Sequence, residues 1–115
     1  DAVGVVAVGE GGSGDNHGLI NSWAGTSAIL RGGSVTGRGG TDAVGISNGE
    51  TGAVLDATSV TILAEGGSVT NVGLQQTDGT VGLGVTQLVG GFLKTGGTLT
   101  CFQVFDQDFL SYTCP

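Results

Sequence analysis

Apolar and β-branched residues occur along the chain in short runs that glycine-rich segments separate. The first run, residues 2–8, is uncharged and rich in valine, which predicts a fully buried strand. Residues 68–74 and 98–105 instead alternate polar with apolar positions. Because strand side chains point alternately to two faces, these stretches predict strands with one buried face. Glycine interrupts every window that could carry helical periodicity, so the pattern predicts an all-β fold.

A strand–Gly-Gly–strand unit recurs along the middle of the chain. Residues 26–36 are echoed by residues 59–70 and, more loosely, by residues 87–100. The copies lie about thirty residues apart, a spacing typical of solenoids and other internally repeated folds. A second echo links residues 42–47 with residues 79–85. Two architectures fit: a glycine-rich β-solenoid, in which short strands stack as coils, or a β-sandwich of short strands with Gly-Gly turns.

Two stretches carry a resemblance to a known family. Residues 42–49 read Asp-Ala-Val-Gly-Ile-Ser-Asn-Gly, and residues 54–62 read Val-Leu-Asp-Ala-Thr-Ser-Val-Thr-Ile. Over residues 32–88 the chain resembles the glycine-rich β-helix passengers of bacterial autotransporters and related adhesins. Their coils run from an Ala-Val-Gly-apolar strand through a Gly, Asn or Asp turn to a Val-Thr-apolar strand. The resemblance implies the solenoid, whereas the residue pattern alone leaves the sandwich open.

The length predicts one all-β domain over residues 1–115. Residues 1–8 form an N-terminal strand that can exchange with a neighbour, and residues 9–18 form a flexible glycine-rich loop. The repeated strand–turn–strand units occupy residues 26–100. Residues 101–115 form a C-terminal end that a disulfide cross-links.

The charge pattern excludes several kinds of partner. Only 11% of the residues are charged, and the formal net charge is −7. The cations Arg31, Arg38 and Lys94 form no basic cluster, which argues against nucleic acid and against anionic membrane surfaces. The sequence also contains no stretch of about 20 apolar residues, so we expect no membrane span.

The two cysteines, Cys101 and Cys114, predict a disulfide in an oxidising compartment. The bond is either internal or a cross-link between subunits. Together with the start at Asp1, it indicates a mature secreted protein whose signal peptide has been removed. Five aromatic residues beside the cysteines predict a local core, an end cap or a docking surface: Phe92, Phe102, Phe105, Phe109 and Tyr112.

No motif predicts catalysis or a cofactor. Residues 9–14 match Gly-x-Gly-x-x-Gly, but the residues that follow are a poor helix start, and dinucleotide binding requires a helix there. The only histidine, His17, lies in the same loop and has no separate triad partners. Weak calcium candidates are the carboxylates Glu10, Asp15, Asp106 and Asp108.

We therefore expect a structural protein, a subunit of a self-assembling extracellular filament, sheath or surface layer whose partner is itself. The uncharged first strand precedes a flexible loop and can pair with a neighbour by strand addition. The residues expected at that contact are Ala2, Val3, Val5, Val6 and Val8. The alternative is a small secreted adhesin or lectin-like module, in which residues 58–61 and 68–70 present hydroxyl groups. We expect no enzyme activity.

Overall fold

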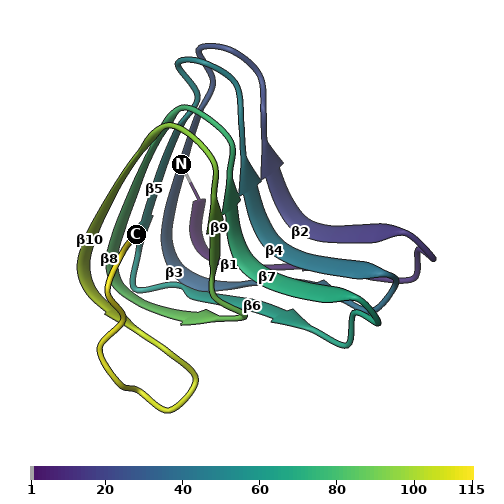
Figure 1. The fold of residues 1–115 in the computed structure, drawn as a ribbon. Helices are drawn as coiled ribbons and strands as arrows, with labels where there is room; N and C mark the ends of the chain where they lie inside the picture. The colour runs from purple at the N-terminus through teal and green to yellow at the C-terminus, as the bar shows by residue number, and fades with distance from the viewer. Residues whose placement is uncertain (1) are drawn as a thin grey trace.

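A computed structural model describes residues 2–115, so Asp1 of the predicted exchangeable strand lies outside the described residues. The described chain is built from β-strands joined by turns, without a helix (Figure 1). The strands are β1 (Ala2–Gly9), β2 (Asp15–Asn21), β3 (Ser27–Arg38), β4 (Asp42–Asn48), β5 (Val54–Thr58), β6 (Thr61–Glu65), β7 (Thr70–Gln76), β8 (Thr80–Val89), β9 (Phe92–Lys94) and β10 (Thr98–Phe105). The predicted all-β class is confirmed.

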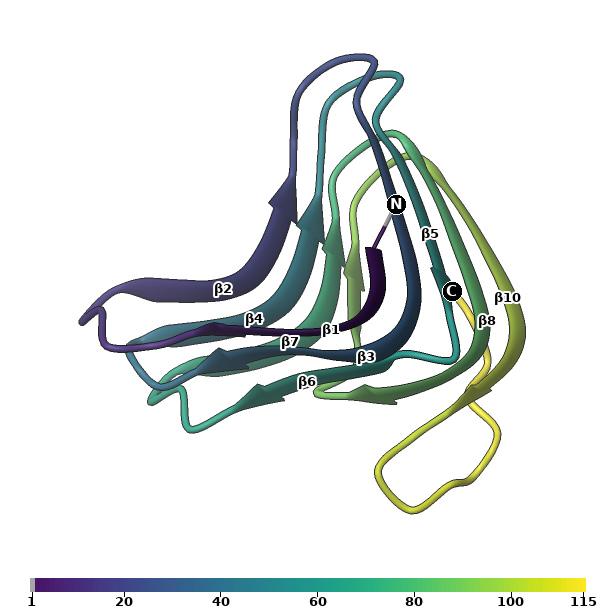
Figure 2. The ribbon, with the colours of Figure 1, turned by 180° about the vertical axis from the view of Figure 1, so that it is seen from behind.

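The chain winds as a β-solenoid. It alternates between two sheets, one ordered β1-β3-β5-β8-β10 with β6 between β3 and β8, and one ordered β2-β4-β7-β9. The strands of both sheets pair in parallel. Since tight hairpins join antiparallel strands, parallel pairing rules out the sandwich of hairpins and leaves the solenoid. Figure 2 shows the coils stacked side by side.

The coils differ in phase from the predicted repeats. Asn21 lies opposite Asn48, 27 residues on, and Asp42 lies opposite Thr70, 28 residues on. The sequence echoes do not coincide with the register of the coils. Residues 26–36 echo residues 59–70, but Ser34 pairs with Thr61. Residues 42–47 echo residues 79–85, yet β4 and β8 lie in different sheets.

Each coil turns one corner at a residue with left-handed backbone. The strands of the first sheet bend where their register-equivalent residues have positive φ. These residues are Gly4, Gly32, Ser59, Val85 and Gln103, with φ of 64°, 73°, 56°, 46° and 54°. Glycine adopts this conformation freely, whereas a β-branched residue such as Val85 is strained in it. The stacked corner therefore imposes its geometry on later coils that lack glycine.

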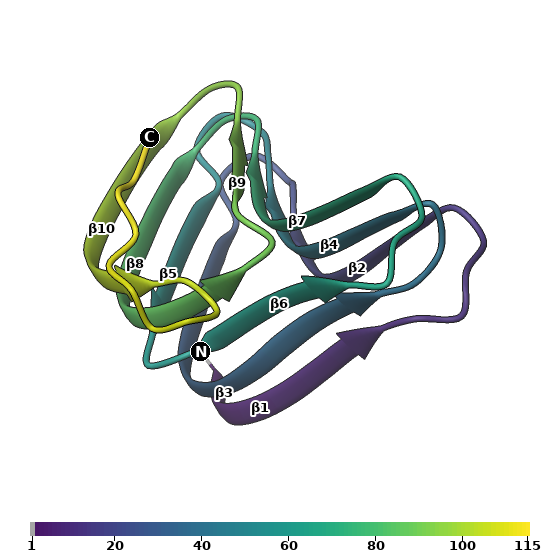
Figure 3. The same ribbon diagram turned by 60° about the horizontal axis from the view of Figure 1, so that its bottom comes forward.

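Glycines also let the two sheets touch at the backbone. A Cβ on Gly37 of β3 would lie 2.0 Å from the Val44 carbonyl oxygen of β4. One on Gly45 of β4 would lie 2.7 Å from Ile62 Cγ2 and 3.3 Å from the Leu63 carbonyl oxygen of β6 in the other sheet, and 2.5 Å from the Gly73 oxygen of β7 in its own sheet. Sheets that pack through side chains lie about 10 Å apart, so this contact forms a much thinner layer. In Figure 3 it is the narrow part in which β2, β4 and β7 lie beside β1, β3 and β6.

The wider part of the coil holds the side-chain core. Its fully buried residues are Ile46, Leu55, Ile62, Leu74, Leu88, Val60 and Val81. Amide side chains line one corner of this core: Asn21 Nδ2 donates to Asn48 Oδ1 at 2.7 Å, and Gln76 Nε2 donates to the Thr98 carbonyl oxygen at 2.9 Å. Buried amides need such partners, so this row ties successive coils together.

The backbone contact predicts that Gly45→Ala destabilises the protein by about 2–3 kcal/mol, because the new methyl group has no room against Gly73 and Ile62. Gly14→Ala is the matched control, since no atom lies within 4 Å of its added Cβ. Urea unfolding followed by circular dichroism measures both values. Equal midpoints for the two variants would contradict the proposed contact between sheets.

Candidate functional site

The N-terminal end of the solenoid is open. β1 is the edge strand at the N-terminal end of its sheet and pairs only with β3 within the described residues, while β2 pairs only with β4. The prediction that residues 2–8 form a fully buried strand is wrong, because Val3 is 75% and Val6 72% exposed. An apolar run suits a buried strand and an edge strand equally, and here no further strand covers it.

The open end also leaves part of the interior uncovered. Ala2, Ala7 and Leu19 pack against the core from the first coil, but each is only partly buried. The two alanines are too small to close the end of the coil. The predicted contact residues Ala2, Val3, Val5, Val6 and Val8 therefore lie on one edge strand, with all four valines exposed.

The C-terminal end is closed by residues 106–115, here called the tail. Asp106 Oδ1 accepts hydrogen bonds from the backbone N–H groups of Asp108 and Leu110, at 2.8 and 3.0 Å, and turns the chain back. The Tyr112 N–H then donates to the Val104 carbonyl oxygen at 2.7 Å. Ser111 forms an antiparallel bridge with Phe105. The tail thus covers the end of β10, the last strand of the first sheet (Figure 1).

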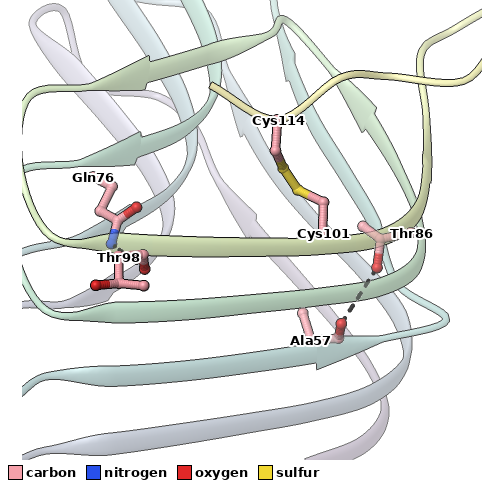
Figure 4. The surroundings of a disulfide bond; sticks show 6 residues. All are labelled: Ala57, Gln76, Thr86, Thr98, Cys101 and Cys114. Carbon is pink, nitrogen blue, oxygen red and sulfur yellow. Dashed lines mark hydrogen bonds between the residues drawn. A yellow bond between two sulfur atoms is a disulfide. The ribbon is translucent and has the colours of Figure 1, made fainter.

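Two side-chain contacts hold the tail in place. The Tyr112 ring meets the Phe92 ring edge-on, with centroids 4.9 Å apart. Cys114 is bonded to Cys101 of β10, so the predicted disulfide is confirmed and lies within one chain (Figure 4). The expected aromatic end cap consists of this pair, whereas Phe102 and Phe109 are exposed. The tail therefore covers part of the C-terminal end of the solenoid, whereas no segment among residues 2–115 covers β1 at the N-terminal end.

Of the carboxylates predicted as weak calcium ligands, Asp106 accepts the hydrogen bonds of the tail turn and Glu10 pairs with Arg38. Arg38 Nε donates to Glu65 at 2.7 Å and Arg38 Nη1 to Glu10 at 3.5 Å, an acid–base–acid row across three coils. Hydrogen bonding and charge from Glu65, with a smaller contribution from Glu10, raise the pKa of Arg38. Sequence reasoning missed this row, although its charges are spaced by one coil.

No metal or nucleotide site is formed by these groups. Within residues 2–115, no cluster of three or more His, Cys, Asp or Glu side chains is arranged to hold a metal ion. The Gly-x-Gly-x-x-Gly segment leads into β2, not into the helix that dinucleotide binding requires. His17 lies within β2. Over the described residues, no helix is long and apolar enough to cross a membrane.

One carboxylate outside the predicted set is fixed by hydrogen bonds. The Gly79 backbone N–H donates to Asp78 Oδ1 at 2.7 Å, and the Thr51 hydroxyl donates to Asp78 Oδ2 at 2.9 Å. These bonds lower the pKa of Asp78, the backbone N–H contributing most. Thr51 and Asp78 belong to the turns after β4 and β7, so the contact joins neighbouring coils.

Comparisons with protein-family models, curated proteins and solved structures found no match to this chain. The geometry of the two ends is therefore the observation that bears most directly on function.

The role of the disulfide predicts that Cys114→Ser lowers the free energy of unfolding by about 3 kcal/mol, because the unfolded chain is no longer cross-linked. Denaturant unfolding of the variant and of the oxidised wild type measures the difference. On a non-reducing gel, the bonded wild type should migrate as a monomer. A disulfide-linked dimer band that vanishes on reduction would contradict the internal bond.

Proposed function

We propose that this chain is a structural subunit of an extracellular assembly, such as a filament, sheath or surface layer, and that it joins a neighbour through its N-terminal end. The observation that carries the proposal is the apolar edge of β1, which no segment covers within residues 2–115, whereas the tail covers part of β10 at the opposite end. An edge strand presents unpaired N–H and C=O groups to a partner strand.

The composition of β1 supports pairing with another strand. Soluble proteins protect such edges with lysine, proline or a covering segment. β1 reads Ala-Val-Gly-Val-Val-Ala-Val-Gly, without charge and without proline. Partner addition would cover the exposed Val3 and Val6 and the partly exposed Ala2, Ala7 and Leu19. The burial of apolar surface and the formation of backbone hydrogen bonds would both favour the addition of a strand to β1.

The C-terminal end of a second copy is the partner that best fits this edge. β1 and β10 end the same sheet, and both bend at register-equivalent residues, Gly4 and Gln103. Parallel addition of β1 to β10 places the bend at Gly4 over the bend at Gln103, as in the stacked coils of one chain. The tail covers part of β10, so continued growth requires it to move aside.

The extracellular setting rests on the disulfide. Structural disulfides persist in oxidising compartments and are rare in the reducing cytosol. Cys101 and Cys114 form such a bond here, at the end that the tail seals.

We predict that Val3→Lys combined with Val6→Lys abolishes self-association. Both side chains are exposed, so the fold tolerates lysine, while the two charges oppose burial of the edge. Sedimentation velocity over a concentration series measures the effect. Wild type should form species larger than a monomer, and the double variant should remain monomeric.

Val69→Lys is the control for that experiment, since Val69 is 72% exposed but lies in the turn between β6 and β7. It should associate like wild type. A wild-type chain that is monomeric at every concentration, or a double variant that assembles unchanged, would overturn the proposal.

A further inference from the structure

One outer face of the solenoid carries two register-aligned rows of residues. The face spans the first half of β3, then β5, then the first halves of β8 and β10. The first row consists of Ile29, Asp56, Gly82 and Thr100. The second row consists of Arg31, Thr58, Gly84 and Phe102. Each row has a glycine on β8, so both rows lack a side chain at that strand.

The two glycines form the floor of a groove of about 350 Å³. Asp56 and Thr58 line it from β5, and Thr100 lines it from β10. Arg31 lies at its β3 side. Strands in a sheet lie about 4.8 Å apart, so β5 and β10 are separated by about twice that distance. A hollow of this width accommodates a single six-membered ring.

The fold does not require glycine at these two positions. Neither Gly82 nor Gly84 has a positive φ. A Cβ on Gly84 would lie 3.7 Å from its nearest neighbour, Thr58 Oγ1, which is an ordinary contact. At Gly82 only the flexible Asp56 carboxylate would be in the way, whereas Gly37 would meet fixed backbone. Glycine inside a strand weakens it and often marks the close approach of a ligand.

The groups around the hollow define the chemistry of a ligand. The Asp56 carboxylate accepts hydrogen bonds, the Arg31 guanidinium donates them, and the hydroxyls of Thr58 and Thr100 do both. Arg31 and Asp56 carry opposite charges, so the lining as a whole favours a neutral ligand. Phe102 continues the second row beside the groove with its side chain 66% exposed, which offers an apolar ring face.

We propose that this groove binds a neutral pyranose unit of a glycan. Its hydroxyls would pair with Asp56, Arg31 and the two threonines, and its C–H face would stack on Phe102. The floor of the groove belongs to β8, between β5 and β10, and β1 does not line it, so sugar binding can be tested on the unassociated chain.

Titration of the ¹⁵N-labelled wild-type protein, at a concentration at which sedimentation velocity shows it to be monomeric, with glucose, galactose, mannose and N-acetylglucosamine tests this site. We expect at least one sugar to shift the amide signals of Gly82, Gly84 and Thr100 saturably, with a Kd of about 1 mM or a few times that.

Gly84→Leu should fill the groove and reduce affinity at least tenfold, as should Phe102→Ala through loss of the stacking face. Val69→Ala, away from the groove, is the matched control and should bind like its parent. Circular dichroism establishes that each variant is folded. Absence of saturable shifts with all four sugars, or undiminished binding by a folded Gly84→Leu variant, would overturn the proposal.

Discussion

Parallel, in-register pairing between successive coils is the constraint on which the rest of this structure depends. It places each corner over the corner of the coil before it, so the left-handed bend of Gly4 and Gly32 recurs at Ser59, Val85 and Gln103. A side chain makes that backbone conformation less favourable, and hydrogen bonds to the neighbouring strands offset this cost. The same register stacks the buried amides and aligns Glu10, Arg38 and Glu65.

The glycine content of the chain has three separable origins. Some glycines turn corners, as Gly32 does. Others, such as Gly37 and Gly45, let the two sheets meet at the backbone, where any side chain would clash. Gly82 and Gly84 do neither, and they open a hollow on an outer face that otherwise carries side chains. Glycine in this protein is therefore used for conformation, for close packing and for surface shape.

The sequence predicts the all-β class and the Cys101–Cys114 bond, because alternation and an isolated cysteine pair are local signals. It does not reveal the coil register, because Gly-Gly pairs look alike but differ in role: Gly32-Gly33 bends the middle of β3, whereas Gly66-Gly67 follows the end of β6. It predicts β1 to be fully buried because an uncharged, valine-rich run occurs in buried strands and in edge strands alike. The groove escapes prediction, since its residues meet only through that register.

Within residues 2–115, the C-terminal end of the solenoid carries a tail that covers part of it, whereas no described segment covers the β1 end. Tyr112 and the disulfide close the last coil, while β1 keeps an unpaired apolar edge. Hydrogen–deuterium exchange of the associated wild type against the monomeric Val3→Lys/Val6→Lys variant tests this difference most directly. The account predicts that association slows exchange most strongly in residues 2–9. Protection confined to other segments, with exchange of residues 2–9 unchanged, would contradict it.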